Sequence, residues 1–219
     1  MDADQPQTKQ ASRSAQTRAR IVAAAVACVD ADGFPGMTFQ RVAREAGVTV
    51  GAVQHYFASK KEMLNAVLEN SFQHFTRCLG DLPAEGLPDL PLDERISIFV
   101  DRAWLHCSSP AYQSTIQILL AIRSDIRGSR EHWSNSPLID TAAQAQELWR
   151  SIFHDLAISD EDHTQLFGFV VSTLSAIAIA DRLAPNSAGL ETQLTYLKVL
   201  VQTIFEKAPE RVKGASFGA

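Results

Sequence analysis

Apolar residues recur at spacings of three and four along almost the whole chain, and this pattern decides the fold class. Near the N-terminus, for example, Ile21, Ala25 and Val29 share one face of a helix. We expect this helix to end at Gly33, because glycine favours helix ends. No segment shows the alternation of apolar and polar residues that indicates a half-buried strand. The sequence therefore predicts an all-α protein.

The stretch "TFQRVAREAGVTVGAVQHYF", residues 38–57, predicts two short helices joined by a glycine turn. Thr38 and Thr49 are suited to cap the two helices, and Gly47 can adopt a positive φ between them. Ser59 and Glu62 have the spacing of a capping box, which predicts the start of a further helix. Two helices joined by such a turn form a helix-turn-helix, whose second helix enters the major groove of DNA.

The outer face of this motif carries groups that can meet nucleic acid. A glutamine such as Gln54 can bond adenine through two hydrogen bonds, Val50 can meet a thymine methyl, and Lys60 suits a phosphate. Ala43 and Val53 are expected to face inward and set the angle between the helices. The motif therefore predicts a DNA-reading surface around the second helix.

At these residues the sequence resembles the TetR family of bacterial transcriptional regulators (TetR/AcrR type). The resemblance rests on Thr38, "VAREAGV", Gly51, "HYF" and Lys60, in the family's order and spacing. It implies that a set of side chains faces operator DNA, mostly its phosphates: Thr38, Arg41, Thr49, Val50, Gly51, His55, Tyr56 and Lys60. Gln54 stands where base choice is often made. Val50 and Gln54 depart from the commoner residues, a Lys or Arg and an aromatic, so the operator sequence does not transfer.

The segment "GDLPAEGLPDLPL", residues 80–92, holds three prolines and two glycines and is not expected to form a regular helix. We expect a disordered tail at 1–14, a TetR-type helix-turn-helix domain at 15–75, a helical ligand-binding and dimerisation domain at 76–208, and a C-terminal tail at 209–219. Helices of the second domain are predicted at 93–107, 111–126, 138–156, 160–183 and 190–207.

Composition and charge restrict the function further. Of the 219 residues, 46% are hydrophobic and 21% charged, which allows a core without disulfides or metal. Three scattered cysteines are typical of a reducing cytoplasm. The apolar run at 166–180 is shorter than the roughly 20 residues of a membrane span, so we expect a cytoplasmic protein with no membrane partner. Residues 1–79 carry a net charge of +2 within a chain of −5, a contrast too small to identify DNA binding alone.

Several residues have a second interpretation. Tyr56 and His55 can instead be a core residue and a solvated one, and Arg13, Arg18 and Arg20 an ordinary solvated face. The acids and histidines between His154 and His163 lack metal-ligand spacing, so we expect no metal and no cofactor. His106 beside Cys107 is not a catalytic pair, because neighbours on a helix point apart. No catalytic motif is present, and we expect the protein not to be an enzyme.

The second domain offers a ligand site and a dimer surface. Trp104, Arg123 and Trp149 are candidates for a small-molecule pocket, although large aromatics at helical spacing are also typical of a core. The last two predicted helices carry wide apolar surfaces, and the resemblance implies that they pair with those of a second copy. We expect a homodimer, a repressor released from a palindromic double-stranded DNA operator by a small-molecule effector. The alternatives are a constitutive DNA-binding protein without a ligand, and a small-molecule-binding protein or enzyme with a non-functional helix-turn-helix.

Overall fold

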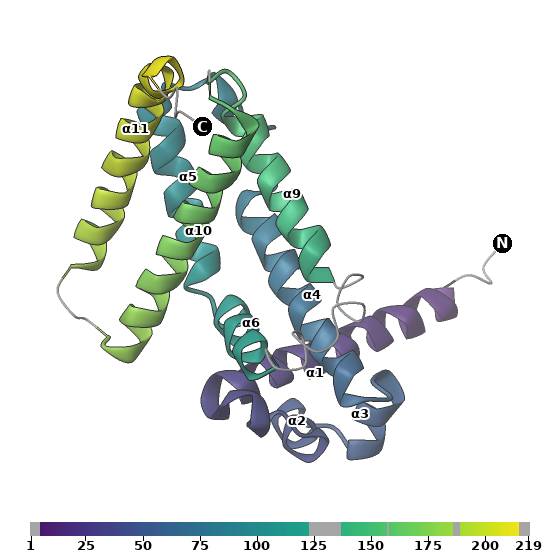
Figure 1. The fold of residues 1–219 in the computed structure, drawn as a ribbon. Helices are drawn as coiled ribbons and strands as arrows, with labels where there is room; N and C mark the ends of the chain where they lie inside the picture. Colours follow the sequence, from purple (N-terminus) through teal and green to yellow (C-terminus); the bar gives the residue numbers. More distant parts are fainter. Residues whose placement is uncertain (1–4, 123–136, 157, 186–188, 215–219) are drawn as a thin grey trace, which may run out of the picture. The chain divides into compact units, whose positions relative to one another are not determined.

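A computed structural model describes residues 5–122, 137–156, 158–185 and 189–214 (Figure 1). Every regular element in these residues is a helix, which confirms the predicted all-α class. The chain forms two compact units. Unit 1 comprises residues 1–72 and 110–138, and unit 2 comprises residues 73–109 and 139–219.

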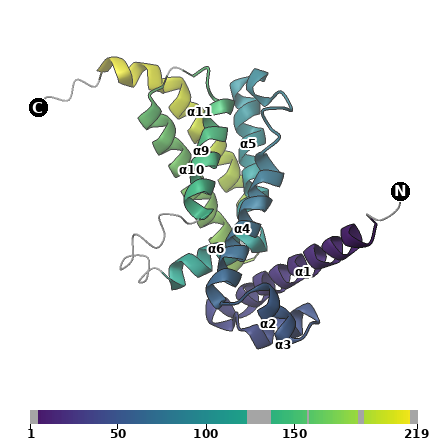
Figure 2. The same ribbon diagram turned by 90° about the vertical axis from the view of Figure 1, so that its right-hand side faces the viewer.

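Unit 1 is built around the helix α1 (Gln5–Gly36), which packs against α2 (Phe39–Ala46) and α6 (Pro110–Ala121). The short helix α3 (Val50–Tyr56) packs on α2, and α4 (Lys60–Leu79) begins in this unit. α1, α2 and α3 lie together in both ribbon views (Figures 1 and 2). The core is fully apolar: Ile21, Ala25, Val29, Met37, Val42, Val53, Phe57, Met63, Val67 and Ile118 are each 2% exposed or less.

Both ends of α1 differ from a simple expectation. The helix breaks at Gly33, which has φ 72°, as predicted, and continues to Gly36 after the break. It begins at Gln5, so the structure extends a helix through most of the segment that we expected to be a disordered tail. Almost all residues at 11–20 are exposed, which explains why their sequence lacks the apolar spacing of the rest of α1.

Unit 2 contains α5 (Leu92–Cys107), α9 (Pro137–Ile152), α10 (Asp160–Leu183) and α11 (Leu190–Gly214), which form a bundle (Figures 1 and 2). Residues 80–92 form turns, the 3-10 helix η1 (Leu87–Asp89) and the start of α5, so the prediction of no regular helix there is confirmed up to Pro91. α11 continues to Gly214, beyond the predicted helix end at 207.

Aromatic rings fill the centre of this bundle. The Trp149 ring lies 5.0 Å from Phe99 and 4.4 Å from Phe153, between ring centroids. Phe205 of α11 stacks on Phe153 at 5.1 Å. Edge-to-face and offset pairs of this kind stabilise a core by about 0.5–1.5 kcal/mol each beyond their burial, so α5, α9 and α11 share one aromatic core.

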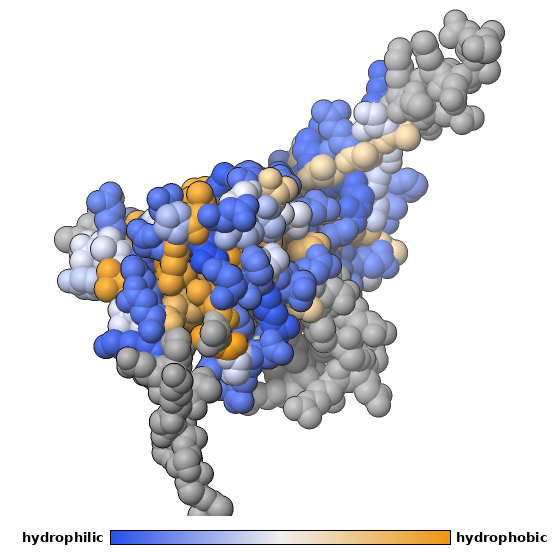
Figure 3. Space-filling model, turned by 90° about the horizontal axis from the view of Figure 1, so that it is seen from above, coloured by the Kyte–Doolittle hydropathy of each residue, from blue (hydrophilic) through white to orange (hydrophobic). Residues whose placement is uncertain are grey.

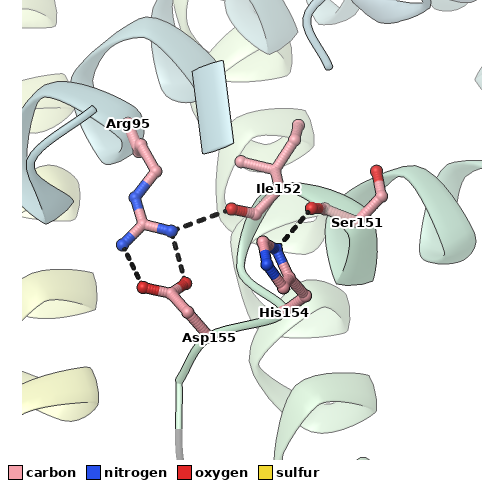
Figure 4. Close-up of polar contacts among 5 residues, drawn as sticks. All are labelled: Arg95, Ser151, Ile152, His154 and Asp155. Atoms are coloured by element: carbon pink, nitrogen blue, oxygen red, sulfur yellow. Dashed lines mark hydrogen bonds and ion pairs between the residues drawn. The ribbon is translucent and has the colours of Figure 1, made fainter. Parts of the chain in front are cut away.

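A buried arginine fixes the end of α9 (Figure 4). Arg95, on α5, donates to both carboxylate oxygens of Asp155, at 2.5 and 2.9 Å, and to the carbonyl oxygen of Ile152, at 3.0 Å. The Arg95 hydrogen bonds hold the pKa of Asp155 below its usual range. Asp155 and the neighbouring His154, which donates to the Ser151 carbonyl, therefore have structural partners. Among the described residues no three acids, histidines or cysteines gather into a metal site.

The outward face of α10 and α11 differs from the one that we expected. Most of the apolar residues that we assigned to a partner chain, including Leu166, Val170, Leu174, Leu197 and Val201, are buried inside unit 2. A second stripe points outward, formed by Phe169, Ile179, Leu183, Tyr196, Val199 and Leu200, which are 37–81% exposed. The expectation was wrong because both faces of these helices are apolar, and the sequence alone does not say which face the chain itself covers.

By length and composition α10 can also cross a membrane, with a mean hydropathy of 1.6 over its most apolar window, of which 28% is buried. That combination is weak support for a span, because core helices of globular proteins pass the same test.

Candidate nucleic-acid interface

The turn between α2 and α3 has the geometry that the sequence predicts. The hydroxyl oxygens of Thr38 and Thr49 accept hydrogen bonds from the backbone N–H groups of Arg41, at 3.3 Å, and Ala52, at 3.1 Å. Gly47 ends α2 with φ 62° and ψ 40°. A Cβ added to Gly47 would meet nothing within 4 Å, so its backbone conformation, and not a lack of space, favours glycine.

The apolar side chains of the motif face inward as expected. Val42 and Val53 are 0% exposed and Ala43 is 3% exposed. Val48 is half-buried against the same core, and Phe57 lies in it. Because α3 buries this side, its opposite side is left outward, with Gly51, Gln54 and His55 exposed.

Gly51 is the most informative residue of that outward side. It lies in the first turn of α3, and a Cβ added there would have only the Thr49 hydroxyl within 4 Å, at 3.9 Å. Glycine within a helix is about 0.5–1 kcal/mol less stable than alanine. Nothing within the described part of the chain therefore requires glycine at this position, which suggests a close approach by another molecule.

Two predicted contact residues are partly used by the fold. Val50 and Tyr56 are half-buried against the core of unit 1. The Tyr56 hydroxyl lies 3.2 Å from the Ser14 hydroxyl of α1, and its ring packs edge-on against His55 at 5.3 Å. Tyr56 therefore combines the two roles that the sequence left open, since its ring contacts the core and its hydroxyl reaches the surface.

The two cations of the predicted set already have partners inside unit 1. The Lys60 ammonium lies 4.2 Å from the centre of the Phe34 ring and 3.4 Å from the Phe34 carbonyl oxygen. Arg41 forms an ion pair with Asp32. Both cations are well exposed or half-exposed, so a phosphate can compete for them.

The start of α4 is fixed by a reciprocal cap. The Ser59 hydroxyl accepts from the Glu62 N–H at 3.1 Å, and a Glu62 carboxylate oxygen accepts from the Ala58 N–H at 3.0 Å. This confirms the predicted helix start and holds Lys60 at the first position of α4.

The predicted ligand residues do not form one site. Trp149 is 1% exposed at the centre of the aromatic core, and its indole N–H has no partner among the described residues. Trp104 is half-buried on α5. Arg123 lies outside the described residues. A cavity of about 260 Å³ opens instead in unit 2, and its lining comes mainly from α10 and α11: Ile158, Asp162, Gln165, Leu166, Phe169, Ile204 and Phe205.

Sequence reasoning missed three features of these units. It did not place α6 in unit 1, where the Ser114 hydroxyl donates to the Val26 carbonyl at 3.2 Å. It did not detect the Arg95 anchor or the contact between Ser14 and Tyr56. Only Arg95 left a signal, as an arginine at the apolar spacing of Ile96, Phe99 and Val100.

Comparison with known proteins agrees with this geometry. A family model described as "Bacterial regulatory proteins, tetR family" matches residues 21–67. The uncharacterized HTH-type transcriptional regulator TtgW of Pseudomonas putida is 46% identical over 77 residues, which are 33% of this chain and 57% of that protein. The HTH-type transcriptional regulator SrpR of Pseudomonas putida is 44% identical over 77 residues, 33% of this chain and 36% of SrpR. The chain thus spans about half or less of the length of these relatives.

A solved structure extends the likeness to most of the fold. A transcriptional regulator from Rhodococcus sp. Rha1 superimposes with a TM-score of 0.67 over 87% of this chain and 97% of that protein, at 16% identity. At this identity the likeness concerns the fold alone. It includes the helices that follow the helix-turn-helix.

Proposed function

Because the chain belongs to the TetR family of bacterial regulatory proteins, we propose that it is a DNA-binding transcriptional regulator that reads its operator with α3. This family consists of transcriptional regulators and not of enzymes. The proposed contact set is Thr38, Arg41, Thr49, Val50, Gly51, Gln54, His55, Tyr56 and Lys60.

The observation that carries this proposal is the outward side of α3. Its exposed Gly51 has no role in the described fold, and the exposed Gln54 lies one turn further along the helix. A glycine lets a DNA backbone approach closely, and an amide reads base edges. The capping hydroxyls of Thr38 and Thr49 accept bonds from the backbone, so their own protons remain able to donate to phosphates.

We propose that the regulator acts as a homodimer through the outward stripe of α10 and α11. A helix-turn-helix reads only a few base pairs, and dimers gain specificity by binding two half-sites. The stripe from Phe169 to Leu200 exposes large apolar side chains on two long helices, and contiguous apolar patches of this kind mark interaction sites. Figure 3 shows one face of the molecule on which apolar side chains reach the surface between polar ones.

The effector is the least specified part of the proposal. We place a small, largely apolar molecule in unit 2, with the cavity beside Phe205 as the first candidate site, since its volume is close to the lower limit for ligand pockets. An effector that favours one arrangement of the dimer weakens operator binding by the same coupling factor, typically about 5–150-fold. α4 runs from unit 1 into unit 2 and is the proposed lever.

Selecting bound fragments from the source genome tests the DNA proposal. The expected result is a pseudo-palindromic site, to which the purified protein binds as a dimer. Screening the protein with small molecules for a raised melting temperature and for release from that site then tests the effector. Failure to enrich any fragment would contradict the DNA proposal, and a site that no compound releases would favour the constitutive alternative.

A further inference from the structure

Two histidines and two cysteines lie together within unit 2, where the end of α4 meets the end of α5. His74 and Cys78 are one helical turn apart on α4, and His106 and Cys107 are the last histidine and last residue of α5. The Nδ1 atom of His74 lies 3.4 Å from Nδ1 of His106 and 3.5 Å from Sγ of Cys78. The established fold and the proposed DNA contacts give this cluster no role.

The two distances are those of neighbouring ligands on one metal ion. Ordinary hydrogen bonds from nitrogen donors are about 2.7–3.2 Å long, so 3.4 Å between two imidazole nitrogens is long for such a bond. Two nitrogens on a tetrahedral ion with bonds of about 2.0–2.1 Å are about 3.3–3.4 Å apart, and a nitrogen and a sulfur about 3.5–3.6 Å. Both separations around His74 Nδ1 agree with these values.

The surroundings also suit a metal that prefers imidazole and thiolate. His106 and Cys107 are 7% and 3% exposed, and His74 and Cys78 are half-buried. Burial lowers the pKa of both histidines, so each offers a neutral nitrogen at neutral pH. Burial raises the pKa of the Cys78 thiol, while nearby Arg77 favours its thiolate.

We propose that His74 Nδ1, Cys78 Sγ and His106 Nδ1 bind one metal ion of the Zn²⁺ class, with Cys107 Sγ as the fourth ligand. Within the described residues no three donors are already gathered around one point, so binding requires the thiols to move. A cysteine side chain has a single torsion, and a change of rotamer moves its sulfur by about 3 Å. Each thiol that binds loses its proton to solvent, and nothing is oxidised or reduced.

Such an ion would fasten the end of α4 to α5 inside unit 2. A ligand that binds only the folded state raises the free energy of unfolding in proportion to the logarithm of its concentration. Metal binding is therefore expected to raise the melting temperature of the full chain, whether or not the protein binds DNA.

The test is a titration of the chelator-treated, reduced full-length protein with Co²⁺ and then Zn²⁺. We expect one Co²⁺ per chain, with a thiolate-to-cobalt charge-transfer band that Zn²⁺ abolishes, and release of protons. His74→Gln and Cys78→Ser should each lose the band. Cys28→Ala is the matched control, because Cys28 is buried in unit 1 and should leave the band unchanged.

Circular dichroism of each variant checks that it is folded, and His74→Gln serves if Cys78→Ser is not. The absence of a band in the wild-type protein, or a band that persists in folded His74→Gln, would overturn the proposal. Because operator binding is measured separately on the same samples, failure of the metal site leaves the DNA proposal standing.

Discussion

Replacing Gly51 with alanine should change stability and DNA affinity in opposite directions. A methyl group at Gly51 would have only the Thr49 hydroxyl near it, at 3.9 Å, which is an ordinary van der Waals contact. Gly51 is not among the glycines with positive φ, so alanine fits its backbone. Alanine is about 0.5–1 kcal/mol more stable than glycine inside a helix, and the free energy of unfolding should rise by about that amount.

The same methyl group should weaken operator binding. It would stand on the side of α3 that we propose lies against DNA, where little space is left for an added group. Overpacking a close-fitting surface costs about 1–3 kcal/mol, which corresponds to a loss of affinity of roughly 5- to 150-fold.

Urea unfolding followed by circular dichroism gives the stability, and fluorescence anisotropy with the selected operator gives the affinity. The control is Ala23→Gly, at an exposed position of α1 in the same unit. It should lower the stability by a similar amount and leave the affinity unchanged. If Gly51→Ala stabilises the protein and still binds DNA as tightly as the wild type, α3 does not approach DNA as we propose.

Three further predictions follow from the structure. Lys60→Ala should reduce the slope of log K against log salt by about 0.9 for the lost phosphate contact, whereas Lys61→Ala should leave the slope unchanged; equal slopes for all three proteins would mean that Lys60 stays on the Phe34 ring. Asp155→Asn should lower the free energy of unfolding by about 1–3 kcal/mol, because it leaves a buried guanidinium without its counter-charge; a loss below the error of urea unfolding would refute this. Burial lowers the pKa of His163 below 6.5, so the unfolded chain binds more protons and stability should fall as the pH drops below 6.5; His163→Gln should flatten this dependence in urea titrations, and exposed His154→Gln should not.

The local features of unit 1 could be predicted from sequence because they depend on residues close together in the chain. The caps at Thr38 and Thr49 and the positive φ of Gly47 each follow from the chemistry of one or two residues. The burial of Val42 and Val53 follows from helical periodicity. Such signals do not depend on how distant segments meet.

The features that could not be predicted all join distant parts of the chain. Arg95 and Asp155 are 60 residues apart, and Ser114 reaches Val26 across 88 residues. The outward face of α10 was misassigned for the same reason, since Leu166 and Phe169 are both apolar and only the packing of the bundle buries one of them. The roles of Gln54 and the other contact residues remain predictions.

A photo-crosslinking residue at position 54, in the protein bound to its selected operator, tests the central claim most directly. Gln54 is exposed on the outward side of α3, so the replacement should not disturb the core. We predict crosslinks to bases in the major groove at two symmetric positions, one in each half-site, separated by about one helical turn or a multiple of it. Crosslinks at a single position, or none while the operator remains bound, would contradict the account.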